Sequence, residues 1–288
     1  MRNRSRSLSQ RPKPRERSAL RPPASMAARG QNASYPIWQT PEDSLVSQRM
    51  STESKRAQEL RRLQKVILAS NVCPRLTKYC EEVARNKRAM YRDQTYWGKA
   101  LPSFGDPEAE LLIIGLAPAA HGGNRTGRIF TGDRSGDFLF RALYEAGFAN
   151  QPGSTNRNDG LKLRNCYITT VVRWAPPQNK PTPEEIRGCL PFLRRELELL
   201  SRVKVVLVLG RLAFDAFLRL ARDQAKLPPR SLMPFGHGAV YDLPDPLPRL
   251  YCSYHPSQHN TQTGRLTRAM FHRVFLDIQK YLASSEPR

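Results

Sequence analysis

Short apolar runs alternate with amphipathic stretches along most of the chain. The apolar runs are typical of buried strands. They cover residues 111–116, 167–172, 203–209 and 250–254. The amphipathic stretches predict helices. They cover residues 135–146, 183–200, 211–222 and 267–282. This alternation predicts an α/β fold, a parallel sheet covered by helices on both faces, because parallel strands need crossover connections.

A different pattern precedes the first of these strands. Leu60, Leu63 and Ile67 recur at helical spacing within a helical region from about residue 52 to residue 92. A break at residues 71–74, which ends in Pro74, separates two helices. We therefore expect the folded domain to cover residues 51–288.

Residues 1–50 lack helical or strand periodicity and contain ten basic residues, three acidic residues, and clusters of Pro and Ser. This composition predicts a disordered basic tail. The Arg-rich and Ser-rich start also resembles an organelle transit peptide, so organelle import is an alternative. A translation start at Met26 or Met50 is a third interpretation.

Basic residues outnumber acidic ones, with 47 Lys and Arg against 25 Asp and Glu, and the net charge is +22. This excess favours nucleic acid as the partner, ahead of an anionic membrane surface or simple solubility. No apolar run approaches the roughly 18 residues that cross a bilayer, so we expect a soluble protein without a membrane partner. The five cysteines are odd in number and lack close metal-type pairing, which favours a reduced, cytoplasmic setting.

The least ordinary sequences follow three of the predicted strands. They are GLAPAAHGGNRTGRIFTGD at 115–133, RWAPPQNKPTP at 173–183 and HPSQHNTQTGRLT at 255–267. Ligands of such sheets bind at the carboxyl ends of the strands. We therefore expect all three loops to converge on one site.

The first and last of these loops together resemble the prokaryotic type b, or fifth-family, uracil-DNA glycosylases, over roughly residues 70–283. The resemblance implies a three-layer α/β/α fold with a central four-stranded parallel sheet. It also implies a monomeric, nucleoid-associated repair enzyme that hydrolyses the N-glycosidic bond of uracil in DNA and leaves an abasic site. Members of this family are associated with hypoxanthine and with double-stranded substrate.

Within this resemblance, Phe130 is expected to stack on a base rotated out of the duplex. Gly115 and Leu116 belong to the same predicted base-binding set. Thr170 stands where the similar fourth family has an Asn that reads the uracil edge. Its single hydroxyl predicts looser base reading. The alternatives are that Phe130 is an ordinary core residue and Thr170 an ordinary strand residue.

His255 is the predicted catalytic donor. Cleavage places negative charge on the departing base, and a neutral imidazole donating to a base oxygen stabilises that charge. Related glycosylases position the attacking water with a polar residue in the first loop, where this chain has Ala117. Backbone groups of residues 115–123 and the Asn124 side chain are the candidates for orienting water, and His121 is an alternative.

The segment after His255 is predicted to approach the DNA backbone closely, because it combines small residues, hydroxyls and a cation. The candidate DNA-binding residues are Ser257, Asn260, Thr261, Thr263, Gly264 and Arg265. Arg128 and Arg125 in the first loop are further candidates, with a solvated surface role as the even alternative.

Members of the resembling families usually carry a four-cysteine iron–sulfur cluster. The matching positions here are Ser70, Cys73, Trp174 and Cys189. Two of the four thiolates are therefore absent, so we expect no metal and no cofactor. Trp174 is predicted to fill the vacated volume, with Cys73 and Cys189 as buried thiols. Cys166 begins a strand that places it too far away to replace a ligand.

Two rival interpretations remain. A catalytically silent DNA-binding module would retain the fold and the charge, and Ala117 and Thr170 favour it. A nucleotide-binding α/β protein is disfavoured, because the chain lacks the GxGxxG or GxxxxGK spacing that holds phosphates.

Overall fold

The computed structural model describes the backbone of residues 41–284 and the side chains of residues 55–284. The chain divides into two units, residues 1–44 and 45–288, and the sheet belongs to the second. The predicted disorder of residues 1–40 lies outside the described residues. Along the described part of the chain, no helix is both long and apolar enough to cross a membrane.

The chain enters the fold through two helices. Helix α1 (Pro41–Ala69) buries Leu60 and Ile67. Helix α2 (Pro74–Arg85) starts at Pro74, the last residue of the break. The break predicted at residues 71–74 is confirmed. The expected tail boundary at residue 50 falls inside α1, and residues 41–50 are helical. Pro41 at the first helical position suits a helix start, because its missing N–H has no intrahelical partner there.

Four parallel strands form the centre of the sheet. They are β2 (Leu111–Gly115), β3 (Cys166–Thr170), β4 (Val205–Leu209) and β6 (Arg249–Ser253). Their spatial order is β3-β2-β4-β6, which confirms the predicted parallel core. Within the described residues the complete sheet has six strands, because β1 (Phe104–Gly105) and β5 (Val240–Tyr241) add antiparallel edges.

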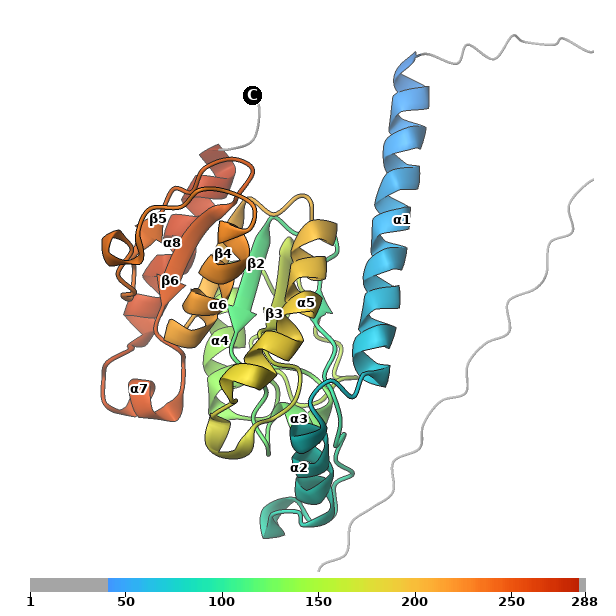
Figure 1. Ribbon diagram of the computed structural model, residues 1–288, viewed down its shortest axis with the longest axis vertical. Coiled ribbons are helices and arrows are strands. Elements are labelled where there is room, and N and C mark those ends of the chain that lie inside the picture. The colour runs from blue at the N-terminus through green and yellow to red at the C-terminus, as the bar shows by residue number, and fades with distance from the viewer. Residues whose placement is uncertain (1–40, 285–288) are drawn as a thin grey trace, which may run out of the picture. The chain divides into compact units, whose positions relative to one another are not determined.

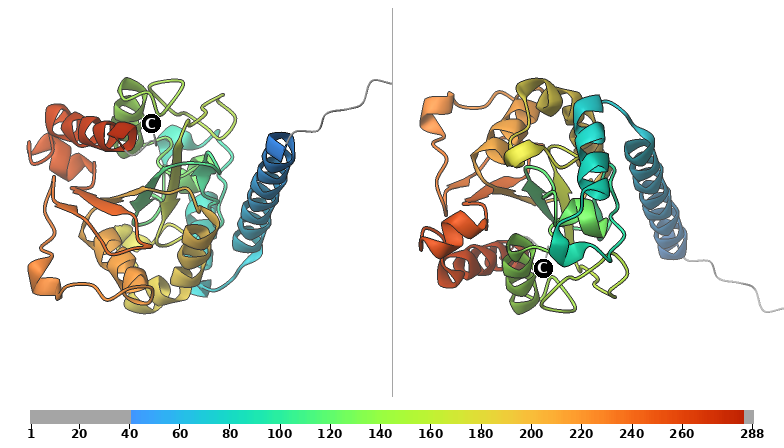
Figure 2. Two further views of the ribbon diagram at one scale, coloured as in Figure 1. Left: turned by 90° about the horizontal axis from the view of Figure 1, so that it is seen from above. Right: turned by 90° about the horizontal axis from the view of Figure 1, so that it is seen from below.

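Alternating side chains of the central strands supply two apolar cores. One core packs α1, α2, α5 (Pro183–Leu199) and α6 (Arg211–Arg222) against residues such as Leu112 and Val206. The other packs α4 (Arg134–Glu145) and α8 (Arg268–Ser284) against the opposite face. Figures 1 and 2 show α5 and α6 on one side of the sheet and α4 and α8 on the other. The strands appear as continuous apolar runs because both faces are covered.

Two of the helices that follow the carboxyl ends of the strands, α4 and α5, start with side-chain caps. Asp133 accepts hydrogen bonds from Ser135 N and Gly136 N at the start of α4. Thr182 and Glu185 form a capping box at the start of α5. Two short helices also lie in the loops of this edge, α3 (Gly123–Thr126) and α7 (Gln258–Gln262). Single 3-10 turns complete the described elements, η1 (Ala89–Tyr91), η2 (Pro177–Asn179) and η3 (Arg230–Leu232).

Candidate active site

Two loops at the carboxyl edge of the sheet bring Phe130 and His255 together. Phe130 lies between β2 and α4, and His255 lies just beyond the end of β6. Their ring centroids are 5.8 Å apart and their planes differ by 28°. This is an offset stack. The two side chains on which the sequence interpretation depended therefore share one site.

Phe130 is held in an unusual backbone conformation by two glycines. Its φ is 52°, in the left-handed region that non-glycine residues rarely adopt. A Cβ atom on Gly115 would lie 2.8 Å from Phe130 Cζ, and one on Gly136 would lie 1.8 Å from the Phe130 carbonyl oxygen. A strained residue fixed this closely is typical of a functional site.

The backbone of His255 is fixed by the turn that follows it. Asn260 Nδ2 donates to the His255 carbonyl oxygen at 2.8 Å, and Ser257 Oγ accepts from Asn260 N at 3.4 Å. Burial lowers the pKa of the His255 ring to about 4, so the imidazole is neutral at physiological pH. Within the described residues no hydrogen bond occupies its ring nitrogens, and they remain available to a ligand.

Thr170 lies beside Phe130 at the end of β3. A Cβ on Gly115 would meet both the Phe130 ring and Thr170 Cγ2, the latter at 3.4 Å. Thr170 is 1% exposed, and its Oγ1 has no hydrogen-bond partner in the described part of the chain. Such an atom marks a place for a ligand atom or a water molecule. Leu116 is partly buried next to it and accepts a hydrogen bond from Val172 N at 2.9 Å.

Asn124 in α3 is fully buried, with Nδ2 donating to the Cys80 carbonyl oxygen at 3.2 Å. Its Oδ1 has no partner among the described residues. Ala117 packs against the apolar core of the α5 face and offers no polar group. The other candidate, His121, contacts Tyr96 Oη through Nδ1 at 3.0 Å, and burial lowers its pKa.

Arg128 is buried in an ion pair, so the structure does not support its predicted role as a phosphate contact. Arg128 is 5% exposed, and its Nη1 lies 2.7 Å from Asp159 Oδ1. The partner stands 31 residues away in sequence, and the sequence shows no pattern that links the two positions. Arg125 is also engaged, since its guanidinium donates to the carbonyl oxygens of His121 and Gly132.

The predicted DNA-binding residues after His255 divide into two groups. Ser257 and Asn260 serve the turn described above, while Thr263 and Arg265 are exposed. Thr263 Oγ1 donates to the His259 carbonyl oxygen at 2.7 Å. The Arg265 guanidinium lies 4.5 Å from the Tyr254 ring centroid, in cation–π contact. Arg265 therefore has a defined position next to His255.

The sequence interpretation did not include His237, which contacts the end of β6 next to His255. Its Nδ1 is 3.2 Å from Ser253 Oγ, and its Nε2 is 3.3 Å from the Met270 carbonyl oxygen. Its ring centroid also lies 5.5 Å from that of Tyr254, the residue before His255, with the two ring planes tilted by 35°. A single His between two glycines, Gly236 and Gly238, has no periodic pattern that would have singled it out.

The residues at the expected iron–sulfur positions do not fit a four-iron cluster. Cys73 and Cys189 are buried, with their Sγ atoms 3.7 Å apart. Ser70 Oγ accepts a hydrogen bond from Val72 N, and Trp174 is 1% exposed inside the apolar core. In the part of the chain that the structure describes, no three His, Cys, Asp or Glu side chains are grouped to hold a metal.

The thiol at Cys73 is also held in its protonated form. The hydrogen bond with Cys189, together with burial, raises the pKa of Cys73. Thiolates are the ligands of iron–sulfur clusters. Cys73 is therefore poorly suited to act as a thiolate ligand, whereas the same hydrogen bond lowers the pKa of Cys189.

The fold and the site together define an α/β/α protein that presents an aromatic platform and a neutral histidine at the carboxyl edge of a parallel sheet. Residues 102–279 match the uracil DNA glycosylase superfamily, and the chain belongs to this superfamily.

Three relatives show where in the superfamily the similarity is concentrated. The type-5 uracil-DNA glycosylase of Thermus thermophilus is 50% identical over 214 residues, which cover 74% of this chain and 94% of the relative. That of Mycobacterium tuberculosis is 47% identical over 219 residues, covering 76% and 80%. The type-4 enzyme of Archaeoglobus fulgidus is 33% identical over 121 residues, covering 42% and 53%.

Proposed function

We propose that this chain hydrolyses the N-glycosidic bond of uracil in DNA and leaves an abasic site, as a step of base excision repair. The relatives named as type-5 uracil-DNA glycosylases support this activity. The observation that carries the proposal is the stack of Phe130 on His255, because it joins a surface for a base to a hydrogen-bond donor.

The chemistry follows from the charges that develop. The bond between C1′ and the base nitrogen breaks, and its electron pair leaves with the base. A water oxygen bonds to C1′ and releases a proton. His255 donates a hydrogen bond to the base oxygen on which the negative charge gathers, and this bond is stronger in the transition state than in the substrate.

The base pocket favours a tolerant specificity that includes hypoxanthine. Phe130 stacks on any base, since every base presents a π-face. Thr170 Oγ1 has no partner in the described part of the chain, so it is free to donate or accept with the edge of the base. We propose double-stranded DNA as the substrate, from which the damaged base is rotated into the pocket.

The attacking water needs a polar group, and Ala117 has none. We propose Asn124 for this role, because its buried Oδ1 lacks a partner among the described residues while its Nδ2 is anchored to Cys80. Backbone groups of the loop from Gly115 to Gly123 are the alternative, and His121 is another.

The activity is tested with duplexes that contain one uracil or one hypoxanthine, followed by alkaline cleavage at abasic sites. We expect strand cleavage of both duplexes and none of an undamaged control. His255→Ala should lower the single-turnover rate by about two to three orders of magnitude, with DNA affinity largely retained. Unchanged turnover in this variant would remove His255 from the mechanism.

A catalytically silent DNA-binding module is the second candidate. Ala117 and Thr170 favour it, because related enzymes have polar water-positioning and base-reading groups at these places. The same duplex panel separates the two, since a silent binder leaves every duplex intact while still binding it.

We also propose that the enzyme works without an iron–sulfur cluster. The support is that Ser70 and Trp174 replace two expected ligands and that Trp174 is packed in the core. Each of the steps above uses groups of the chain itself, and none of them requires a metal.

A further inference from the structure

The connection between α4 and β3 is a closed loop that reaches the carboxyl edge of the sheet. Residues 150–162 close at their base, where Ala149 bridges Leu163 and Asn150 N donates to the Lys162 carbonyl oxygen at 3.1 Å. A connection from the end of a helix to the start of the next parallel strand belongs at the amino edge of the sheet. This loop instead reaches the carboxyl edge, because Ser154 and Asp159 contact Arg128 in the loop that carries Phe130.

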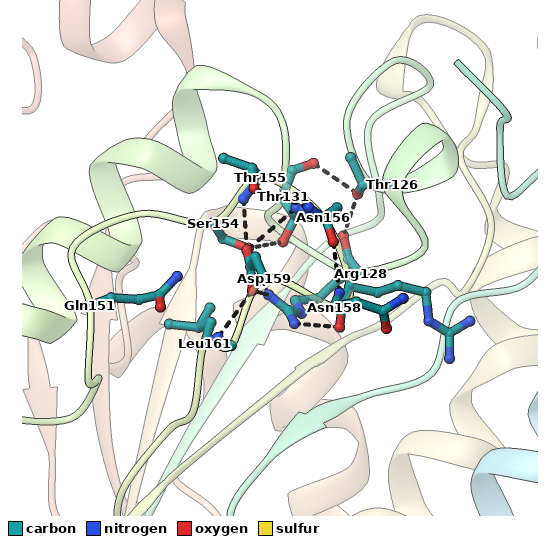
Figure 3. Close-up of polar contacts among 12 residues, drawn as sticks. Thr126, Arg128, Thr131, Gln151, Ser154, Thr155, Asn156, Asn158, Asp159 and Leu161 are labelled. Carbon is teal, nitrogen blue, oxygen red and sulfur yellow. Dashed lines mark hydrogen bonds and ion pairs between the residues drawn. The ribbon is translucent and has the colours of Figure 1, made fainter. Parts of the chain in front are cut away.

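Asp159 organises the tip of this loop (Figure 3). Its carboxylate accepts from Arg128 Nη1 at 2.7 Å, from Thr155 N at 2.8 Å and from Leu161 N at 3.0 Å. Burial alone would raise the pKa of Asp159, but these hydrogen bonds outweigh it and lower the pKa to about 2. Both side chains of the ion pair with Arg128 are less than 10% exposed, at 6% for Arg128 and 7% for Asp159.

Further hydrogen bonds fasten the tip to the loop that carries Phe130, as Figure 3 also shows. Arg128 Nη1 donates to Ser154 Oγ at 2.9 Å, and Arg128 Nη2 donates to the Arg157 carbonyl oxygen at 2.7 Å. Thr131 Oγ1 and Ser154 Oγ lie 2.7 Å apart. The backbone of residue 157 is therefore fixed relative to the base platform.

The fixed tip presents a cation. The Arg157 guanidinium and the Lys99 ammonium each lie 4.5 Å from the centroid of the same Trp97 ring. Both residues are exposed, and no carboxylate pairs with either one among the described residues. Trp97 and Arg157 also pack against Gly127, where a Cβ would lie 3.0 Å from the indole and 3.3 Å from Arg157 Cδ. This cation pair thus lies close in space to Gly127, which is three positions before Phe130.

We propose that Lys99 and Arg157, held on Trp97, form a site for the phosphate backbone of DNA beside the base pocket. The inference rests on the proposed glycosylase function. Two cations held on one ring, with no carboxylate partner among the described residues, concentrate positive charge at one point of the surface, and a phosphate chain neutralises this charge. The shared aromatic ring and the buried ion pair beneath Arg157 hold the cations in place before DNA arrives, which reduces the entropy lost on binding.

This site has a role distinct from that of the residues around His255. Arg157 lies on the segment that follows α4, and Lys99 lies on the segment before β1. Gly98 N, next to Lys99, donates to the Asn124 carbonyl oxygen at 3.1 Å. Among the described residues, however, the ring contacts of the Lys99 and Arg157 side chains include no side chain assigned to the reaction. We therefore expect the site to contribute to affinity and to the orientation of the duplex, and not to the bond-breaking step.

The test compares Lys99→Ala, Arg157→Ala and Arg157→Lys with Arg222→Ala in the full chain. Arg222 is exposed in the last turn of α6, far along the chain from the loops of the site, and it serves as the matched control. Fluorescence anisotropy measures the affinity for an undamaged duplex as a function of salt. Each Ala variant at the site should weaken binding about fivefold near 0.15 M salt and reduce the salt slope by about 1. Arg157→Lys and Arg222→Ala should retain the slope.

Single-turnover cleavage at saturating uracil duplex is the second measurement. The site predicts an unchanged maximal rate in Lys99→Ala and Arg157→Ala. If wild-type protein binds and cleaves DNA while both variants keep its affinity and salt slope, this inference is overturned and the proposed function stands. If wild-type protein binds no DNA at any salt concentration, both fail together. A reduced maximal rate with normal affinity would also overturn the inference, because it would assign these residues to the reaction.

Discussion

At the scale of single residues, the chemistry depends on the neutrality of His255. Burial against Phe130 and the core lowers the pKa of the ring to about 4, whereas a free histidine titrates near 6.5. As the pH falls, the folded state therefore takes up this proton at a lower pH than the unfolded chain does. As the pH falls from about 6.5 towards about 4, this difference destabilises the folded state, because the unfolded state binds more protons.

This shift predicts how His255 titrates. In a proton–nitrogen correlation NMR experiment, we expect the His255 ring signals to titrate with a midpoint near 4. The single-turnover rate should show no inflection between about pH 5 and about pH 8, where the ring stays neutral. A His255 midpoint near the ordinary histidine value would show that the ring is charged within the working range.

Gly115 gives a second prediction at this scale. A Cβ at this position would lie 2.8 Å from Phe130 Cζ, so Gly115→Ala should push the ring away from its place over the site. We expect a single-turnover rate lower by roughly tenfold to a hundredfold, since a displacement of about 1 Å at a reacting site has effects of that size. Gly153→Ala is the control, because nothing lies within 4 Å of the added methyl group. Equal rates for both variants would contradict the positioning of Phe130 by Gly115.

At the scale of elements, the ion pair between Arg128 and Asp159 joins two loops that the sequence shows as separate. Arg128→Ala would leave the Asp159 carboxylate buried without its cationic partner, at a cost of about 3–5 kcal/mol in the free energy of unfolding. Arg141→Ala is the control, because the Arg141–Glu145 pair is exposed, with 54% and 43% of the side chains accessible. An exposed pair contributes about 0–1 kcal/mol.

Urea unfolding at neutral pH measures both changes. The contribution of Asp159 should be present above its unfolded pKa, near 4, and should disappear as the pH falls through about 2, because its folded-state pKa is lowered. If Arg128→Ala and Arg141→Ala lower the free energy of unfolding by the same small amount, the Arg128–Asp159 pair has no structural role.

The regular elements could be predicted from the sequence, while the long-range polar contacts could not. The four central strands and helices α4, α5, α6 and α8 were predicted close to their observed bounds, because apolar periodicity reports burial directly. The edge strands β1 and β5 have two residues each, too few for a pattern. The start of α1 was missed because residues 41–50 lack apolar periodicity.

The site shows the same division. The family resemblance suggested His255 and Phe130, in loops that follow strands, and Thr170, at the end of β3. The parallel topology brings these three residues together. Arg128 was predicted to contact DNA, but the structure shows it buried in an ion pair with an acidic residue 31 positions later. The sequence of a loop does not distinguish an exposed basic residue from one that is buried by such a distant partner. His237 was missed since its contacts with Ser253 and Met270 exist only in the folded chain.

At the scale of the whole molecule, charge and packing set what the protein can bind. The net charge of +22 favours binding to DNA, and this electrostatic contribution depends on salt but not on base sequence. Specificity for the damaged base must therefore come from the buried site around Phe130 and His255, where few groups are charged. Trp174 lies in the apolar core on the α5 face of the sheet, at one of the four positions expected from the family resemblance to carry a cluster ligand.

The composition of this core predicts the iron content of the purified protein. Trp174 is 1% exposed and Ser70 is no thiolate, so the wild-type chain should contain no stoichiometric iron or sulfide and should lack a visible absorbance band. The double variant Ser70→Cys/Trp174→Cys places four cysteines at the matching positions, including the buried pair with Sγ atoms 3.7 Å apart. After anaerobic incubation with iron and sulfide, this variant should acquire a brown colour and four irons, while Ser70→Cys alone should not, because the indole still fills the site. Four irons in freshly purified wild-type protein would show that the chain builds a cluster from other ligands.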